Sequence, residues 1–164
     1  MQRFVIVTSL FLYITGIAVA QQWTTYTTVN SGLADNTVKV VCIDSYGVKW
    51  FGTSAGLCRF DDMNWTTFTT EDSLAHNSVN DIAFEMGWSP KIWVATEGGV
   101  SVVGVEPATI TFATPYRTDN TGLISNRVNS VTVDKNHLKW FGTDEGISRF
   151  DGSNWMNFTS KTSS

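Results

Sequence analysis

A five-residue run that occurs twice constrains the fold more than any other feature of this chain. Residues 49–53, Lys-Trp-Phe-Gly-Thr, return unchanged as residues 139–143. A looser copy, Ile-Trp-Val-Ala-Thr, occupies residues 92–96 between them. In each copy a short polar turn and a glycine follow, and then a second apolar run; the glycines are Gly56, Gly99 and Gly146. Such periodic self-similarity predicts a chain built from one supersecondary unit used several times.

The complete repeat unit has four parts. It opens with an Asn-x-Val sequence, whose asparagines are Asn36, Asn77 and Asn126. Alternating apolar positions follow and end at an acid, which is Asp44, Glu85 or Asp134. The tryptophan run and the apolar run after the glycine are the second and third parts. The fourth part is aromatic, with Trp65 and Phe68, then Phe112 as a weaker match, then Trp155 and Phe158. Alternation and turn residues of this kind indicate short strands, and the acids are expected to form turns.

Four short strands at this spacing predict an all-β chain of β-propeller blades. The opening asparagines lie 41 and then 49 residues apart, which is typical of a propeller blade. A β-sandwich seldom repeats its sequence, and a β-helix has a much shorter period. We predict three four-stranded blades at residues 36–76, 77–125 and 126–164, preceded by an orphan outer strand and linker at residues 21–35.

Three blades form an incomplete ring, because closed propellers typically have four to eight. We therefore expect either that the chain is the first part of a longer propeller, or that its open blade faces associate with another chain. Further propeller blades or a second chain are thus the expected protein partners.

The first twenty residues predict a signal peptide. Arg3 supplies a positive charge, an apolar run extends over residues 4–19, and small residues at 18 and 20 fit cleavage after Ala20. An uncleaved anchor is the alternative, but the run is short for a bilayer span of roughly 20 residues. No other run predicts a membrane span, so we expect a soluble periplasmic or secreted protein.

Composition argues against nucleic-acid binding, and the repeat argues against a disulfide. The 11 basic residues are outnumbered by 15 acidic ones, which gives no basic face. Cys42 and Cys58 fall on the first and third strands of one unit, where two inter-strand steps separate them. That separation of roughly 9–10 Å exceeds the span of a disulfide. We predict that both cysteines are free, small, buried side chains.

With the units aligned, the sequence resembles the two-component regulator propeller repeat, which reads roughly Asn-x-Val, an acidic turn, Trp-x-Gly-Thr, x-Gly-Leu and Phe-Asp. The first unit matches at Asn36, Val38, Asp44, Trp50, Gly52, Thr53, Gly56, Leu57, Phe60 and Asp61. The third unit matches at Asn126, Val128, Asp134, Trp140, Gly142, Thr143, Gly146, Ile147, Phe150 and Asp151. The middle unit departs, with Ala95, Val103 and Gly104 at three of these positions. The resemblance implies a periplasmic sensor of a hybrid histidine kinase, in which a carbohydrate fragment is the signal.

No catalytic, metal or cofactor motif emerges from the residues. His76 and His137 occupy different places in the repeat and are interpreted as turn residues. The sequence contains neither a glycine-rich phosphate loop nor a nucleophile elbow. We therefore predict no enzymatic activity and no cofactor. An enzyme, such as the propeller lyases that have similar blades, is the weakest of the alternative functions.

The remaining hypothesis is ligand binding, with an oligosaccharide as the expected ligand. The turns after the second strands and the connections between blades share one face of a propeller. That face should display Ser54, Glu97, Asp144 and Glu145, which are polar groups able to bind a sugar or peptide. Trp88, in an inserted loop, is a candidate stacking platform. Trp50, Trp93 and Trp140 are expected to pack between blades, and the three opening asparagines to cap turns. A structural propeller segment that assembles with other chains is the alternative function.

Overall fold

The structure is a computed structural model that describes residues 23–106 and 109–160. The predicted signal peptide and its cleavage after Ala20 lie outside the described residues. Within those ranges every regular element is a strand, apart from one 3₁₀ turn, η1, at Thr70–Asp72. No helix in these two ranges has the length and apolar character needed to span a bilayer.

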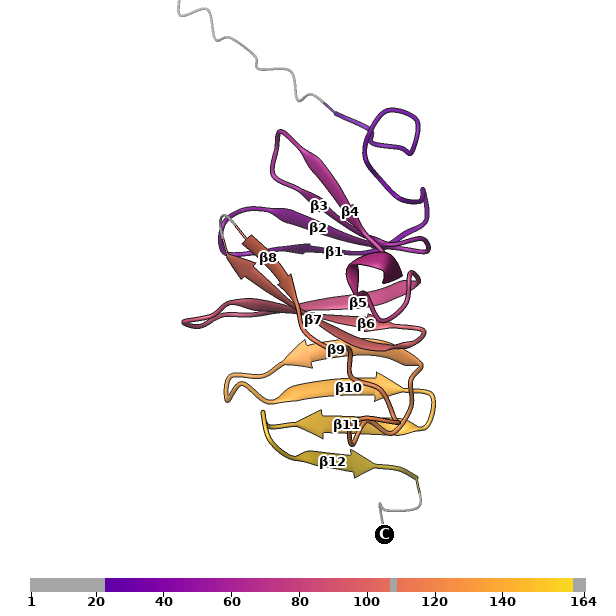
Figure 1. Cartoon of the computed structure of the whole chain (residues 1–164), viewed down its shortest axis with the longest axis vertical. Helices are drawn as coiled ribbons and strands as arrows, with labels where there is room; N and C mark the ends of the chain where they lie inside the picture. The colour runs from indigo at the N-terminus through magenta and orange to yellow at the C-terminus, as the bar shows by residue number, and fades with distance from the viewer. Residues whose placement is uncertain (1–22, 107–108, 161–164) are drawn as a thin grey trace, which may run out of the picture.

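The strands form three four-stranded antiparallel sheets, each a meander in chain order (Figure 1). Blade A consists of β1 (Val38–Ile43), β2 (Lys49–Thr53), β3 (Leu57–Phe60) and β4 (Trp65–Phe68). Blade B consists of β5 (Val79–Glu85), β6 (Lys91–Thr96), β7 (Gly99–Glu106) and β8 (Thr109–Phe112). Blade C consists of β9 (Val128–Val133), β10 (Lys139–Thr143), β11 (Gly146–Phe150) and β12 (Trp155–Phe158). The predicted all-β fold of propeller blades is confirmed.

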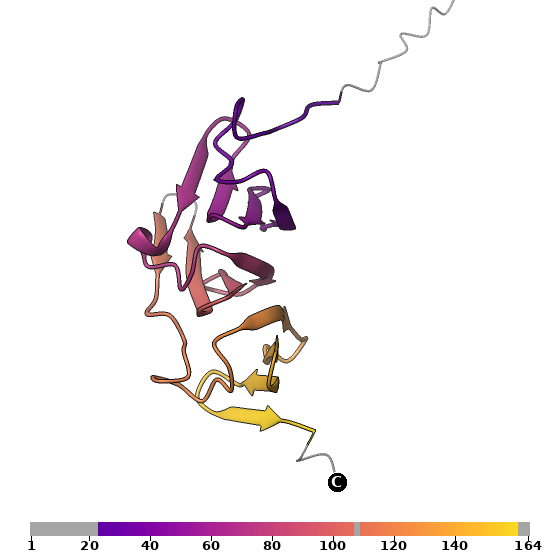
Figure 2. The same cartoon turned by 90° about the vertical axis from the view of Figure 1, so that its right-hand side faces the viewer.

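The three sheets stack face to face as an arc (Figure 2). The first strand of blade B, β5, packs beside both β1 and β9, so the first strands of the blades are neighbours. The outer strands β4 and β8 follow the opposite edge of the arc (Figure 2). This radial order, with first strands inside and fourth strands outside, is that of a propeller.

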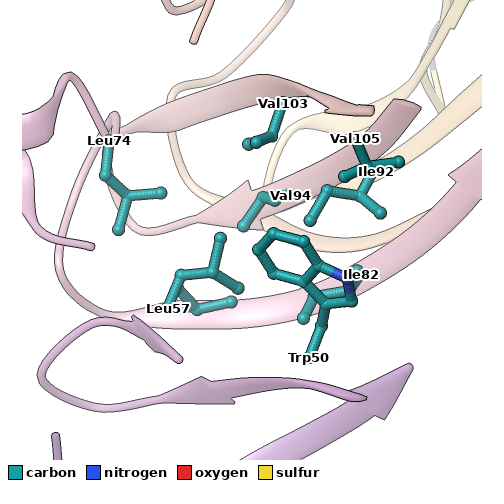
Figure 3. Close-up of a cluster of buried hydrophobic side chains, with 9 residues drawn as sticks. Trp50, Leu57, Leu74, Ile82, Ile92, Val94, Val103 and Val105 are labelled. Atoms are coloured by element: carbon teal, nitrogen blue, oxygen red, sulfur yellow. The ribbon is translucent and has the colours of Figure 1, made fainter. Parts of the chain in front are cut away.

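Two apolar clusters hold the blades together. Between blades A and B, Trp50 and Leu57 project from β2 and β3 onto Ile82, Ile92 and Val94 of blade B (Figure 3). The second cluster lies between blades B and C and consists of Trp93, Ala95, Val100, Val102, Leu123, Val128, Val131, Phe141 and Phe150. A tryptophan is suited to this role because one side chain removes a wide apolar area from water.

The threonine and glycine that recur in all three blades close the turn between the second and third strands. The Thr53 hydroxyl donates to the Gly56 carbonyl at 2.8 Å and accepts from the Ala55 amide at 3.1 Å. Thr96 and Thr143 make the same pair of hydrogen bonds in blades B and C. Gly56 has a φ of +157°, and a Cβ there would meet the carbonyl oxygen of Phe68. The glycine is required because only it tolerates that backbone and that approach.

The opening asparagines cap the connections that lead into each blade. Asn36 accepts from the Thr28 amide at 2.9 Å. Asn77 and Asn126 accept in the same way from the amides of Thr70 and Thr118, both at 2.8 Å. A side-chain oxygen that accepts from a nearby backbone amide stabilises such a turn. Their repetition therefore has a structural cause.

Both cysteines are free, as predicted, but only one is buried. The Cys58 sulfur accepts from the Ala34 amide at 3.2 Å, at the position where Ser101 and Ser148 accept from Ala75 and Ile124. Cys42 is half-buried on β1. The prediction that both are buried is wrong for Cys42, which lies at the edge of the cluster between blades A and B and is only partly covered by it.

Residues 23–35 differ from the prediction, because they carry no strand. A strand requires backbone pairing with a neighbour, and residues 23–35 pair with no described strand. It forms instead a connection like the one that precedes blade C: Tyr26 packs on Phe60 and Trp65, at ring-centroid distances of 5.6 and 5.4 Å. Tyr116 packs on Phe150 and Trp155 in the same way, at 5.6 and 5.8 Å.

In blade B, Tyr116 rather than Phe112 takes the place of the last aromatic residue. It bridges to Val100, as Phe68 pairs with Leu57 and Phe158 with Ile147. The sequence comparison selected Phe112 because the longer β7 of this blade moves the aromatic position by several residues.

Candidate ligand-binding site

Each first strand contains a β-bulge directly after its first valine. In blade A, Val38 pairs with Thr53 and Val40 with Gly52, so Lys39 is the extra residue. Asn80 and Asn129 are the corresponding residues of β5 and β9. A bulge turns its side chain away from the regular alternation, and bulges are enriched beside functional sites. Because β1, β5 and β9 are neighbours, the three polar side chains lie along one inner edge of the arc.

The bulged residues belong to a polar network that crosses both blade interfaces. The Lys39 ammonium donates to the Ser78 hydroxyl at 2.8 Å and to the Asn80 side-chain oxygen at 2.9 Å. The Asn80 amide donates in turn to Glu97 Oε1 at 2.9 Å and to the Val128 carbonyl at 2.9 Å. Side chains of blade A and the backbone of blade C are thereby connected through one asparagine.

The network continues on blade C through Arg127. Its Nε lies 2.9 Å from Glu97 Oε2 and 3.4 Å from Asp144 Oδ2. The Asn129 amide donates to Asp144 Oδ1 at 2.6 Å. The members of this bulge network are Lys39, Ser78, Asn80, Glu97, Arg127, Asn129 and Asp144. It is open to solvent, and the two Nη groups of Arg127 donate no hydrogen bond within the described ranges.

Two of the predicted ligand-binding residues, Glu97 and Asp144, meet in this network. Ser54 and Glu145 are exposed in the equivalent turns, β2–β3 and β10–β11, without side-chain contacts to the network. Trp88 lies at the other end of β6, in the turn between β5 and β6, and its side chain is fully exposed. The structure therefore separates Trp88 from the carboxylates with which it was grouped.

Sequence reasoning missed Lys39, Asn80, Arg127 and Asn129. For Lys39, Asn80 and Asn129 the available signal was a polar residue directly after the first valine of every unit; Arg127 stands before that valine. A side chain at that place in a regular strand would simply be exposed, so the bulge that turns it inward was not recognised.

The acids at the ends of the first strands all accept a hydrogen bond from a tryptophan indole, and the two aspartates also close a turn. Asp44 accepts from the amides of Tyr46 and Val48, which closes the β1–β2 turn as predicted. Its other oxygen accepts from the Trp50 indole at 2.9 Å. Asp134 and Trp140 form the same contact at 3.1 Å, and Glu85 and Trp93 at 2.7 Å. Glu85 has no turn contact, and its second oxygen accepts from Lys139 of blade C at 3.1 Å.

Opposing effects set the pKa of Glu85. Partial burial raises it, but hydrogen bonds from Trp93 and Lys139, together with the positive charge of Lys139, hold the pKa below its ordinary value. The carboxylate is therefore ionised near neutral pH and forms a largely buried ion pair with Lys139. This pair joins blades B and C at the opposite end of the strands from the pair of Arg127 and Glu97.

The two histidines lie apart in the structure. His76 Nδ1 accepts from the Ser78 amide at 3.0 Å, and His137 lies in the β9–β10 turn, 3.5 Å from Glu85 Oε1. Within residues 23–106 and 109–160, no three His, Cys, Asp or Glu side chains are grouped so that they could hold a metal ion.

Comparison with known proteins identifies similar folds but no family. No protein-family model matches the chain, and a search of curated proteins found no significant match. Among solved structures, the chain is similar to the extracellular domain of a protein assigned to the hybrid two-component systems of B. thetaiotaomicron. The two share 24% identity at a TM-score of 0.67, over 85% of this chain and 19% of the other.

The structure of streptogramin B lyase is also similar. It shares 16% identity at a TM-score of 0.52, over 80% of this chain and 43% of the lyase. The chain therefore spans about a fifth of the extracellular domain and less than half of the lyase. Similarity at these levels defines the propeller fold, which sensors and enzymes share.

Proposed function

We propose that this chain is an exported, ligand-binding part of a sensor propeller, and that the bulge network contacts the ligand. The observation that carries the proposal is the recurrence of one bulged polar residue in every first strand, joined across blades by Glu97 and Arg127. The fold shared with the extracellular domain of a two-component system supports a sensing role. The function proposed is binding and not catalysis, although one structure of similar fold is a lyase.

The chemistry of the network suits a polyhydroxylated ligand, and we propose an oligosaccharide. Planar amide, guanidinium and carboxylate groups offer pairs of donors and acceptors in fixed geometry, which matches adjacent sugar hydroxyls. The free Nη groups of Arg127 supply donors, and the partly exposed carboxylates of Glu97 and Asp144 supply acceptors. A sugar hydroxyl can thus both donate and accept a hydrogen bond within this one site.

The test is a glycan array with the full chain, followed by isothermal titration with any oligosaccharide that binds. We expect Glu97→Gln to weaken binding roughly 10- to 100-fold, because hydrogen bonds to a charged group are lost. Glu71→Gln, at an exposed acid of η1 outside the network, is the matched control and should bind like the wild type. Absence of any binding glycan, or equal weakening by both substitutions, would overturn the proposal.

A second candidate function is assembly through the outward face of blade A. Val41 on β1 is 56% exposed, whereas its counterparts Ile82 and Val131 are 7% and 6% exposed. Ile43 beside it is 60% exposed. In blades B and C this face is covered by the preceding sheet, so the occupant that fits it is a further blade of the same kind.

Light scattering distinguishes this candidate. If the face of β1 binds a further blade of a second copy, the mass of the full chain should rise with concentration, and Val41→Lys should return it to the monomer. A monomer at all concentrations would contradict assembly between copies and would leave oligosaccharide binding unaffected.

A further inference from the structure

A pocket lies between blades B and C, at the opposite end of the strands from the bulge network. Its volume is about 380 Å³, within the range of small-molecule sites. Trp93, Val102 and Gly104 of blade B line it, together with Lys139 and Phe150 of blade C. Lys91, Thr111 and Tyr116 also line this interblade pocket.

The interblade pocket exists because blade B departs from the repeat at two positions. In each blade a cross-strand residue stands opposite the tryptophan: Arg59 faces Trp50, Arg149 faces Trp140, but Val102 faces Trp93. The Arg59 guanidinium forms an ion pair with Asp61 at 2.9 Å. The counterpart of Asp61 in blade B is Gly104. An arginine and an aspartate of blade A are therefore replaced in blade B by Val102 and Gly104, and the space beside Trp93 stays open.

The charges in the interblade pocket favour an anion. The two Glu85 oxygens already accept from Trp93 and Lys139. The Lys139 ammonium has three N–H groups, and Glu85 and the His137 carbonyl use two of them. Lys91 lines the pocket with no hydrogen bond or ion pair to any described residue. Lys91 and Lys139 thus place two positive charges beside the single negative charge of Glu85, which leaves the pocket with a net positive charge.

The apolar part of the pocket is aromatic. The ring of Tyr116 lies 5.9 Å from that of Trp93 and 5.6 Å from that of Phe150, measured between centroids. Trp93 and Phe150 are 6.3 Å apart. The rings pack against one another at tilted and edge-on angles and line the pocket, and aromatic surface of this kind accepts a flat molecule by stacked or edge contacts.

We propose that the interblade pocket binds a small planar carboxylate, a single-ring aromatic acid, with its ring among Trp93, Tyr116 and Phe150 and its carboxylate at Lys91 and Lys139. This site is separate from the proposed oligosaccharide site, because the two lie at opposite ends of β6. Binding at one does not require binding at the other.

The test is isothermal titration of the full chain with benzoate, with benzamide as the neutral probe of the same shape. We expect benzoate to bind and benzamide to bind roughly 10- to 100-fold more weakly, because the charged hydrogen bonds are absent. No heat with millimolar benzoate, or equal affinity for the two compounds, would overturn the proposal.

Two substitutions locate the site. Val102→Arg introduces the residue of blades A and C, fills the pocket, and should abolish benzoate binding. Lys91→Met should weaken it roughly 10- to 100-fold, whereas Lys135→Met, at an exposed lysine in the β9–β10 turn, should not change it. Near-ultraviolet circular dichroism verifies that each variant is folded. Unchanged benzoate binding in folded Lys91→Met would contradict the site, even if Val102→Arg failed to fold.

A cross-check separates the two proposals. Val102→Arg should leave oligosaccharide binding intact, and Glu97→Gln should leave benzoate binding intact. Loss of both ligands in either variant would show that the two sites are not distinct, and would overturn the inference of a separate pocket.

Discussion

The interface between blades A and B and the interface between blades B and C use the same repeat positions but differ at one end. Between A and B, Trp50 is fully buried beside the Arg59–Asp61 ion pair. Between B and C, Val102 and Gly104 leave a pocket beside Trp93, and the ion pair there joins Glu85 to Lys139 of the neighbouring blade. The repeat thus sets how sheets stack, and departures from it create local chemistry.

The largest expected effect is the loss of the buried indole from the filled interface. Trp50→Ala should reduce the free energy of unfolding by about 3–5 kcal/mol, since it leaves a cavity that the packed sheets cannot close. Trp93→Ala should cost about 1–2 kcal/mol less, because the vacated volume joins a pocket that is already open. Urea denaturation measures both. Equal costs would mean that the two interfaces are equally packed.

Breaking the ion pair that is specific to the second interface should have the next largest effect. Lys139→Met leaves Glu85 without its ammonium partner and should destabilise the fold by about 3 kcal/mol. Lys91→Met, at a lysine of blade B that lines the same pocket without an ion pair to a described residue, is the control and should change stability by less than about 0.5 kcal/mol. Denaturant titration measures both variants, and an equal loss of unfolding free energy in the two would contradict a stabilising role for the Glu85–Lys139 ion pair.

The same carboxylate should make stability depend on pH. Because the pKa of folded Glu85 lies below its unfolded value, ionised Glu85 stabilises the fold above the unfolded pKa. This contribution is lost as the pH falls through the folded pKa. The difference in unfolding free energy between wild type and Glu85→Gln should therefore be constant near neutral pH and shrink below about pH 4. A difference that stays constant down to pH 2 would contradict this role.

The smallest change in stability is expected at Cys58, a position that has the same role in all three blades. Cys58, Ser101 and Ser148 each accept the backbone amide of the connection that enters their blade. Cys58→Ser should therefore change the melting temperature little, with less than about 1 kcal/mol in stability. A large loss would show that blade A holds its connection differently from the other two.

The sequence was sufficient to predict the blades because each blade repeats its own turn chemistry. Thr53, Gly56 and Trp50 act within one sheet or on its immediate neighbour, so their pattern is visible along the chain. Lys39 and Arg127 could not be selected, because their partners belong to other blades. The bulge that orients Lys39 appears in the sequence only as a three-residue step between apolar positions, from Val38 to Val41, which was not interpreted as a bulge. Phe112 was chosen over Tyr116 because the longer β7 changes the spacing.

The interblade pocket was partly visible in the sequence. Gly104 was recognised as a departure of the middle unit, but its meaning depended on knowing that Val102 stands opposite Trp93. The register between strands is needed to see that the small residues Val102 and Gly104 leave one space open beside Trp93. Neighbouring positions along the chain become one site only after the sheets are stacked.

The most direct measurement is ¹⁹F NMR of the full chain labelled with 5-fluorotryptophan, with each resonance assigned by substitution and followed during benzoate titration. We expect the Trp93 resonance to shift with benzoate, while the Trp50 resonance, in the filled interface, stays in place. A Trp50 shift as large as that of Trp93, or no shift of Trp93 at saturating benzoate, would contradict the difference between the two interfaces.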